Sequence, residues 1–435
     1  MNKYFFWSLT VALAGFLFGF DTIVISGADE TLQNLWNSSN DFHGFVVMAA
    51  ALWGTVIGAM AGSIPTNIYG RKNTLIGIGV LFLVSAVGSA MVNDPYLFAF
   101  FRLIGGLGVG ASTIAAPAYI AEISPADKRG RLVAMYQLSI VLGILVAFLS
   151  NYMLQDIGEN AWRWMIGVEA FPALIYCGMI LFVPRSPRWL VNQGRMEEAE
   201  AVLKMVDPKA DVQQFAKEVK TQGKTSTESI FSPKYRAALL LVFFIAFFNQ
   251  FSGINAFLYY APRIFKEAGL GESSAFLSSI GIGVTNLAFT LLGMALIDRL
   301  GRKQLMYIGS VGYILSLGLV AMAFMLDWQG MAVPIFLFLF IASHAIGQGT
   351  VIWVFIAELF PMHLRASGAA FGSSVHWVLA ALIPSLIPSL FSSIGPGVVF
   401  AMFALMMVGQ LAWVYLKMPE TKGQTLEEVS RKLAN

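Results

Sequence analysis

The sequence is short of charge, cysteine and histidine, and each shortage excludes a kind of protein. Charged residues make up 12% of the 435 positions, whereas a soluble globular domain carries about 25%. The chain therefore lacks the charge to coat a water-facing surface. The single cysteine, Cys177, excludes an internal disulfide. The four histidines show no close ligand spacing, and neither a Walker A pattern nor a nucleophile–base pair is present. We expect no metal, no cofactor and no enzymatic activity.

Long apolar runs take the place of charge. Hydrophobic residues make up 57% of the chain and the mean hydropathy is +0.70. A bilayer crossing takes about 20 apolar residues, and this length predicts twelve spans in an all-α membrane protein. The predicted spans are 5–27, 44–66, 74–93, 96–121, 132–154, 163–183, 237–262, 273–297, 304–326, 331–357, 366–391 and 396–417.

The basic residues predict which span ends face the cytoplasm. Arg102 lies inside a span, and Arg163, Arg263 and Lys266 lie in odd-numbered connections, which leaves 24 of the 28 Lys and Arg residues in even-numbered connections or in the tails. Connections rich in Lys and Arg stay cytoplasmic. Both termini are therefore predicted to be cytoplasmic. The polar interval 185–236 is predicted to form short amphipathic helices on that side.

Three polar landmarks recur in the two halves of the chain. "NIYGRKN" at 67–73 matches "DRLGRKQ" at 298–304, and "AEISPADKRG" at 121–130 matches "AELFPMHLRA" at 357–366. "VPRSPR" at 183–188 recurs weakly as "MPETKG". Such a repeat indicates two six-helix bundles, an architecture of secondary transporters. The predicted domains are an N-terminal bundle at 1–184, a cytoplasmic helical linker at 185–236, a C-terminal bundle at 237–417 and a cytoplasmic tail at 418–435.

These landmarks, together with "QFSGINAFLYYAP" at 250–262, resemble the sugar porter family of the major facilitator superfamily. The resemblance covers essentially the whole chain. It extends to bacterial proton-coupled sugar symporters and, more distantly, to glucose facilitators. It implies the major facilitator fold, a monosaccharide and a proton as partners, no nucleic acid, and a monomer that crosses the bacterial inner membrane, a plasma membrane, many times.

Three charged residues lie inside predicted spans, namely Asp21, Arg102 and Glu169. Each lies roughly 9–10 Å inside the outer end of its span at about 1.5 Å per residue. A lone charge at a helix centre costs roughly 2.5–3.5 kcal/mol, which favours pairing. Two acids around one base are not neutral, so one carboxylate has reason to take up a proton. A static ion pair that orients helices is the alternative. The resemblance favours a proton switch, because the family's symporters carry the Asp and the Arg whereas its passive facilitators have Asn in place of the Asp.

The predicted sugar site consists of amides and aromatic rings, because amides both donate to and accept from hydroxyls and rings cover the apolar faces of a sugar. An interruption of span 7 near Gly253 would turn Gln250 and Asn255 inward. A buried amide can instead tie two helices together. The candidate residues are Gln137, Asn249, Gln250, Asn255, Asn286, Trp353, His376, Trp377 and Phe18.

The resemblance assigns sugar contacts to five of these candidates, namely Gln137, Gln250, Asn255, Asn286 and Trp353. Three positions depart from the family pattern. Asn249 replaces a second Gln, Ile144 replaces a Gln of the xylose symporter, and His376 replaces Asn or Gln. Ile144 resembles the hexose facilitators and favours a hexose.

A second set of charges lies at the inner ends of spans 4 and 10 and in the neighbouring loops. The resemblance implies that they form a cytoplasmic latch that closes the inner side. Arg185 stands where the family has a Glu, which predicts a weaker or differently connected latch in the first half. The latch candidates are Arg71, Glu122, Arg129, Arg302, Glu358 and Arg365.

These features together predict a proton-coupled sugar symporter, with a hexose as substrate, that works by alternating access. A passive sugar facilitator is the first alternative, and Asp21 argues against it. The amide-rich span 7 argues against a proton–drug antiporter. A sugar receptor without transport is the alternative from another class, and the short tail argues against it.

Overall fold

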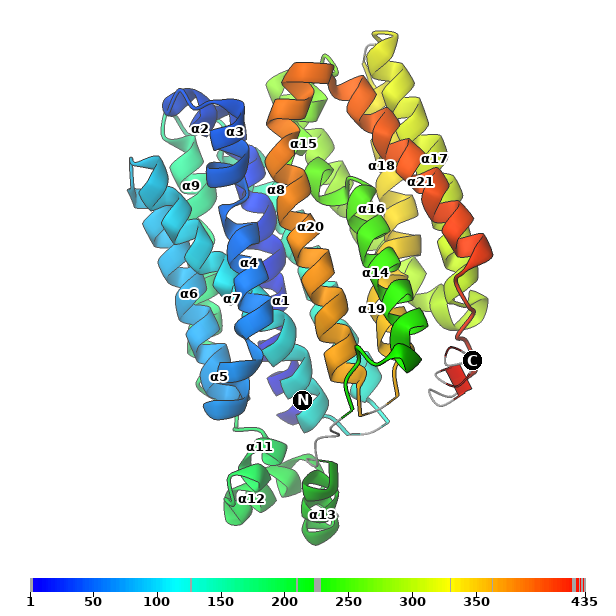
Figure 1. The fold of residues 1–435 in the computed structure, drawn as a ribbon. Coiled ribbons are helices and arrows are strands. Elements are labelled where there is room, and N and C mark those ends of the chain that lie inside the picture. Colours follow the sequence, from blue (N-terminus) through cyan, green and yellow to red (C-terminus); the bar gives the residue numbers. More distant parts are fainter. Residues whose placement is uncertain are drawn as a thin grey trace. The chain divides into compact units, whose positions relative to one another are not determined.

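The computed structural model describes residues 3–125, 127–208, 210–222, 228–328, 330–361, 363–424, 428, 429, 431 and 433, and all regular elements over them are helices (Figure 1). The first part of the chain contains α1 (Lys3–Val24), η1 (Ile25–Gly27), α2 (Asp29–Leu35), α3 (Asn40–Phe42), η2 (His43–Met48), α4 (Ala50–Ala61), α5 (Ser63–Ile68), α6 (Arg71–Met91), α7 (Pro95–Ile123), α8 (Arg129–Leu154), α9 (Ala161–Gly167), α10 (Ala170–Ile180), α11 (Pro187–Asn192), α12 (Met196–Val206) and α13 (Val212–Gln222). The second part contains η3 (Pro233–Tyr235), α14 (Arg236–Phe251), α15 (Ile254–Glu267), α16 (Glu272–Leu300), α17 (Arg302–Met325), α18 (Ala332–His344), η4 (Ala345–Gly349), α19 (Thr350–Glu358), α20 (Arg365–Ile394) and α21 (Pro396–Leu416).

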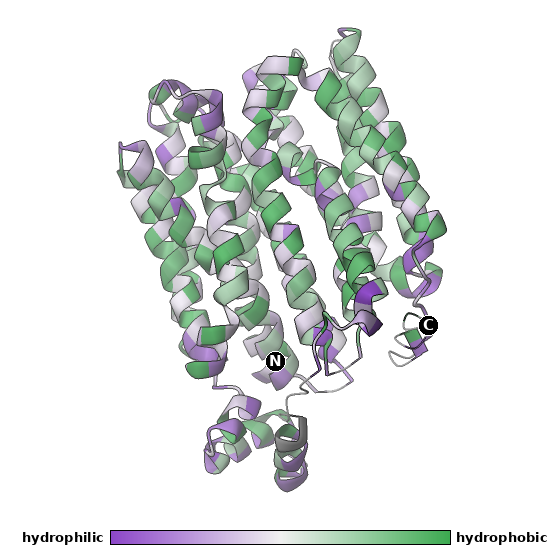
Figure 2. Cartoon of the chain, viewed as in Figure 1, coloured by the Kyte–Doolittle hydropathy of each residue, from purple (hydrophilic) through white to green (hydrophobic). Residues whose placement is uncertain are grey.

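The number of helices that could cross a membrane agrees with the sequence prediction. Among the described residues, 11 helices are long and apolar enough, and the pair Asn40–Met48 and Ala50–Ala61, bent by 43°, makes up to 12. Figure 2 shows hydrophobic residues along the long helices, with hydrophilic residues gathered in α12, α13 and at helix ends. The predicted second span is therefore broken rather than straight.

The bend in the second span follows a π-helix, η2. A π turn widens the helix and usually marks a functional or packing constraint. Here the constraint is a close approach to α20, since a Cβ on Gly44 would lie 2.0 Å from the carbonyl oxygen of Ser385. Only glycine leaves room for this contact.

Two further spans are interrupted. Gly253, with φ +81°, separates α14 from α15, so the predicted break in span 7 is confirmed at this residue. A side chain at Gly253 would be strained by that φ and would also meet the ring of Phe403 at 2.6 Å. The tenth span contains the π-helix η4 between α18 and α19.

The chain divides by its contacts into two compact units. The first comprises Met1–Thr22, Ala50–Ala147 and Arg163–Ser226, and the second comprises Ile23–Ala49, Phe148–Trp162 and Thr227–Asn435. Segments 23–49 and 148–162 of the predicted first half thus group with the second unit, and between these two segments Asn151 Nδ2 donates to the Val24 carbonyl at 3.1 Å. The division into sequence domains at 184 and 237 stays a prediction. The predicted tail 418–435 lies partly outside the described residues.

The predicted linker contains the expected amphipathic helices. Residues of α11, α12 and α13 share a small apolar core, and Ser186 caps α11 by accepting a hydrogen bond from the Trp189 amide at 3.2 Å. The core residues are Trp189, Leu190, Val191, Ala199, Val202, Ala216 and Val219.

Candidate functional site

A buried ion pair lies within the first unit, between α1 and α7. Arg102 Nη1 donates to Asp21 Oδ1 at 2.5 Å, and Arg102 Nη2 donates to the Asp21 backbone oxygen at 2.7 Å. Both side chains are 0% exposed. Glycine at position 105 makes room beside the pair, since a Cβ there would lie 3.2 Å from Asp21 Oδ1.

Glu169 completes this charge cluster. It precedes α10 at the break that follows α9, it is 0% exposed, and it interacts electrostatically with both Asp21 and Arg102. The three intramembrane charges predicted from sequence therefore do lie together. With both acids ionised the cluster carries one net negative charge, which one bound proton neutralises. The cluster thus has the charges to hold or release a proton at a fully buried position.

Most of the predicted sugar-site residues meet in the second unit, at the break in span 7. Asn255 Nδ2 donates to Gln250 Oε1 at 2.8 Å, and Gln250 Nε2 donates to Asn249 Oδ1 at 2.8 Å. The rings of Trp353 and Trp377 flank the ring of His376, at centroid distances of 5.0 and 4.9 Å. The Gln250 amide nitrogen lies 3.2 Å from His376 Nδ1 and 3.3 Å from Nε2.

Three candidates lie outside this amide group. Asn286 is buried on α16, where its Oδ1 accepts from Thr290 Oγ1 at 3.4 Å. Gln137 on α8 and Phe18 on α1 belong to the first unit, and both are half-buried. The sugar-binding role of all nine candidates stays a prediction.

Three buried polar residues behind the amide group were missed by the sequence pattern. Gln348 on η4 accepts from Asn249 Nδ2 at 3.4 Å, and its own amide nitrogen donates to Gln410 Oε1 at 2.9 Å. Gln410 on α21 in turn donates to Ser310 Oγ on α17 at 2.8 Å. The only sequence signal was a glutamine between two glycines in a predicted span, in "GQG" at 347–349.

The latch candidates form separate ion pairs in the two units. Arg71 Nη2 donates to Glu122 Oε1 at 2.9 Å, and Ser186 Oγ donates to the other oxygen of Glu122. Arg302 Nη2 donates to Glu358 Oε1 at 2.8 Å. No ion pair of Arg129 or Arg365 occurs among the residues that the structure describes.

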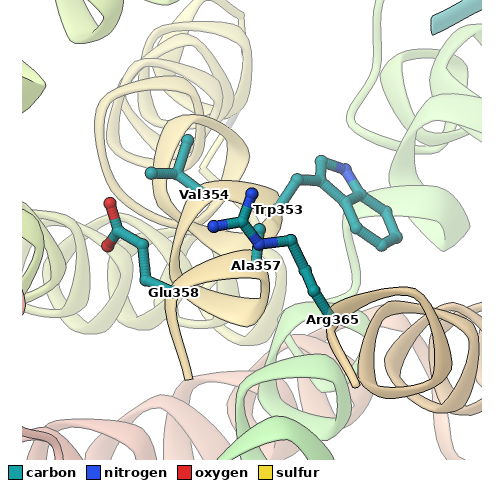
Figure 3. Close-up of a pocket in the computed structure, with 5 residues that line it drawn as sticks. All are labelled: Trp353, Val354, Ala357, Glu358 and Arg365. Carbon is teal, nitrogen blue, oxygen red and sulfur yellow. The ribbon is translucent and has the colours of Figure 1, made fainter. Parts of the chain in front are cut away.

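Arg365 instead lines a cavity of about 420 Å³ in the second unit, together with Trp353, Val354, Ala357 and Glu358 (Figure 3). Figure 3 shows the Arg365 side chain reaching from α20 towards α19. Helix α19 thus carries both a sugar-site candidate, Trp353, and a latch candidate, Glu358, along one cavity wall.

The two repeated motifs after spans 6 and 12 differ in structure. Glu420 accepts hydrogen bonds from the backbone amides of Arg302 at 3.0 Å and Lys303 at 2.9 Å, and so caps the start of α17. In the first unit the corresponding residue is Arg185, which lies 5.7 Å from the Trp189 ring and repels Lys72. A cation replaces the anion that a helix N-terminus favours.

Replacing Arg185 with Glu should therefore raise the melting temperature of the purified protein. The new carboxylate would attract Lys72 and face the start of α6, a kind of contact worth about 0.5–2 kcal/mol. A thermal unfolding assay in detergent checks this, with Arg188→Glu as the control that makes the same charge change on α11. Equal shifts in both variants would contradict the capping explanation.

A second charge cluster in the second unit was also missed. Asp29, 1% exposed, lies 2.8 Å from Arg263 Nε and 2.6 Å from His43 Nε2. Lys266 Nζ lies 2.6 Å from Glu30. We name the group Asp29, His43 and Arg263 the outer cluster; it ties the segment after α1 to α15. The span prediction from hydropathy placed Asp29 and Arg263 in connections and His43 just before the second span, so it gave no sign that the three residues meet.

The broken spans, the buried charges and the buried amides define a multi-pass membrane transporter of the major facilitator superfamily. A family model described as "Sugar (and other) transporter" matches residues 7–433, and the chain belongs to this family. It is therefore a transporter and not an enzyme.

Relatives match over nearly their whole length. The chain is 33% identical to the D-xylose–proton symporter of Escherichia coli K12, over 98% of this chain and 96% of that protein. It is 36% identical to the glucose transporter GlcP of Staphylococcus epidermidis, over 99% and 97%. A solved structure of the xylose transporter XylE from E. coli, in an inward-open conformation, matches with a TM-score of 0.88 and 31% identity, over 98% of each chain.

Proposed function

We propose that this protein is a proton-coupled monosaccharide symporter of the bacterial inner membrane, with both termini in the cytoplasm. The observation that carries the proposal is the fully buried Asp21–Arg102 pair with Glu169 beside it. An ionisable cluster inside a membrane is expensive, and such clusters mark ion and proton pathways. The names of several relatives, such as the arabinose–proton symporter of Bacillus subtilis at 33% identity, support the same coupling.

Coupling follows from linkage between the two binding events. Protonation of the cluster weakens the hold of Asp21 on Arg102 and so changes the free energy of the conformations that differ in this contact. Sugar binding at the amide group changes the same equilibrium. Each ligand then raises the affinity for the other by the same factor. The ion pairs at Glu122 and Glu358 supply the proposed cytoplasmic latch.

We assign a hexose as the substrate. Ile144 on α8 is 8% exposed and apolar where the xylose symporter pattern has a glutamine, which removes one amide from the site. The relatives' names include glucose, xylose and arabinose transporters, so the choice of sugar rests on this residue.

Sugar uptake into proteoliposomes, with and without an inward proton gradient, tests the proposal. We expect one hexose among labelled glucose, galactose, fructose, xylose and arabinose to accumulate above equilibrium only when the gradient is present. A protonophore should reduce the level to that of simple equilibration. Equilibration of sugar with no accumulation would make the protein a passive facilitator, and accumulation of a pentose would contradict the hexose assignment.

A further inference from the structure

A continuous line of hydrogen bonds runs through the second unit from the break in span 7 to α17. In order, Asn255 donates to Gln250, Gln250 to Asn249, Asn249 to Gln348, Gln348 to Gln410, and Gln410 to Ser310. The donor–acceptor distances are 2.8, 2.8, 3.4, 2.9 and 2.8 Å. Every amide nitrogen points towards Ser310. We call these six residues the amide relay.

Two backbone carbonyls fix the direction of the relay. Ser310 Oγ donates its proton to the Met306 carbonyl at 2.7 Å, which leaves the hydroxyl oxygen as an acceptor for Gln410. Gln348 Nε2 also faces the Ile245 carbonyl at 3.4 Å. A carbonyl cannot donate, so a nitrogen must face it. Turning any one amide around would bring two donors or two acceptors together.

Because the relay is buried, reversing the direction of its hydrogen bonds would cost free energy. Gln250 is 1% exposed and Asn249 is 3% exposed, while Gln348, Gln410 and Ser310 are all 0% exposed. An unpaired polar group at such a site costs about 1–3 kcal/mol. Reversing one amide would leave such groups unpaired or opposed, so the relay favours one orientation of all its members.

The direction of the relay also determines which donor and acceptor atoms of Gln250 and Asn255 remain for a ligand. Both hydrogens of Gln250 Nε2 are used, one by Asn249 Oδ1 and one by the His376 ring. Asn255 is half-buried and uses one hydrogen towards Gln250. Its Oδ1 is turned away from the relay and accepts no bond along it. The oxygens of Gln250 and Asn255, together with one hydrogen of Asn255 Nδ2, therefore remain for a ligand, so the two amides offer more acceptor than donor capacity.

We propose that Gln348, Gln410 and Ser310 are positioning residues for sugar recognition, which orient Gln250 and Asn255 so that these amides meet sugar hydroxyls as acceptors. The inference rests on the proposed function, because it concerns the same site. It adds a specificity rule: at least one hydroxyl of the sugar acts as a hydrogen donor to the span-7 amides. Fluorine in place of that hydroxyl accepts but cannot donate.

Two serines of α17 provide a matched test. Ser310 and Ser316 are both 0% exposed, and each donates to the carbonyl four residues earlier at 2.7 Å, but only Ser310 receives the relay. We expect Ser310→Ala to raise KM for sugar about three- to tenfold in a counterflow assay, as the loss of one buried hydrogen bond implies. Ser316→Ala should leave KM unchanged, and Ser310→Thr should restore it. Gln348→Met, which cuts the relay nearer the site, should raise KM further.

The orientation of the amides can be tested by measuring how well singly fluorinated sugars compete with the labelled parent sugar. In the wild type, one fluorinated position should compete at least tenfold less well than the parent sugar. In Gln348→Met this ratio should fall towards one, because the span-7 amides lose their connection to both carbonyl anchors. In Ser310→Ala it should fall less, because Gln348 still faces the Ile245 carbonyl. A general loss of packing would weaken the parent and fluorinated sugars equally and leave the ratio unchanged.

The outcomes separate this inference from the proposed function, because counterflow requires no proton gradient. An unchanged KM and an unchanged fluorine ratio in both variants would overturn the relay even if proton-driven accumulation is intact. Normal counterflow without accumulation would overturn only the proton coupling. A wild type that binds and exchanges none of the sugars would overturn both.

Discussion

Asp21→Asn is expected to abolish accumulation of sugar against its gradient while sparing sugar exchange. Asparagine keeps the shape of the side chain and an oxygen that accepts from Arg102, so the 2.5 Å contact can persist. It cannot change its charge, however. Position 21 then no longer binds or releases a proton, so the proton gradient cannot drive sugar transport through it. The ratio of internal to external sugar should fall to one at every pH.

Accumulation and counterflow in the same proteoliposomes measure this effect. Asp156→Asn, which removes an exposed carboxylate from a loop, is the control and should behave as the wild type. Glu169→Gln tests the other buried acid: if it alone loses accumulation, the coupling proton belongs to Glu169. If gradient-driven uptake persists in Asp21→Asn, the Asp21–Arg102 pair has only a structural role.

The second large effect is expected at the outer cluster. Arg263→Gln leaves the carboxylate of Asp29, 1% exposed, without its guanidinium. Breaking a buried ion pair costs up to about 3–5 kcal/mol, and the remaining contact of Asp29 with His43 at 2.6 Å reduces this cost. The cluster ties the segment after α1 to α15, so its loss should destabilise the conformations in which this contact is closed. The conformations open to the outer side should become more populated.

Labelling of a cysteine at position 286, a buried sugar-site candidate on α16, reports this shift. In a Cys177→Ser, Asn286→Cys background, Arg263→Gln should increase the rate of labelling from the outside by at least tenfold. Lys266→Gln is the matched control, because Lys266 and its partner Glu30 are 26% and 36% exposed, and exposed pairs contribute only about 0–1 kcal/mol. A rate equal to that of the control would show that the outer cluster does not hold this side closed.

The helical fold and the number of spans could be predicted from the sequence, because each span is an apolar run long enough to cross a bilayer. The sequence could not locate the bend at Ala49 or the π-helix η4, since a π turn depends on what packs against it. The break at Gly253 was predictable because glycine interrupts an otherwise apolar helix between two polar residues.

Within the site, the charged trio was predictable and the amide relay was not. Charges stand out in an apolar run, and their depth follows from helical rise alone. Gln348 and Gln410 are 62 residues apart, and Ser310 and Gln410 are 100 apart, so only the packing of α17, η4 and α21 shows that they meet. The outer cluster was missed for the same reason, since Asp29 and Arg263 lie in different predicted connections, far apart in the sequence.

The position of Gly253 affects how readily protons could cross the membrane without sugar. The hydrogen bond between Asn255 and Gln250 crosses the break at this residue, so any further bending of span 7 there would pull the two amides apart. Without sugar, both amides would lose a partner, which costs about 1–3 kcal/mol for the buried Gln250 and less for the half-buried Asn255. Sugar hydroxyls can replace the lost bond. We therefore expect the empty carrier to cycle more slowly than the loaded one, so that few protons cross without sugar.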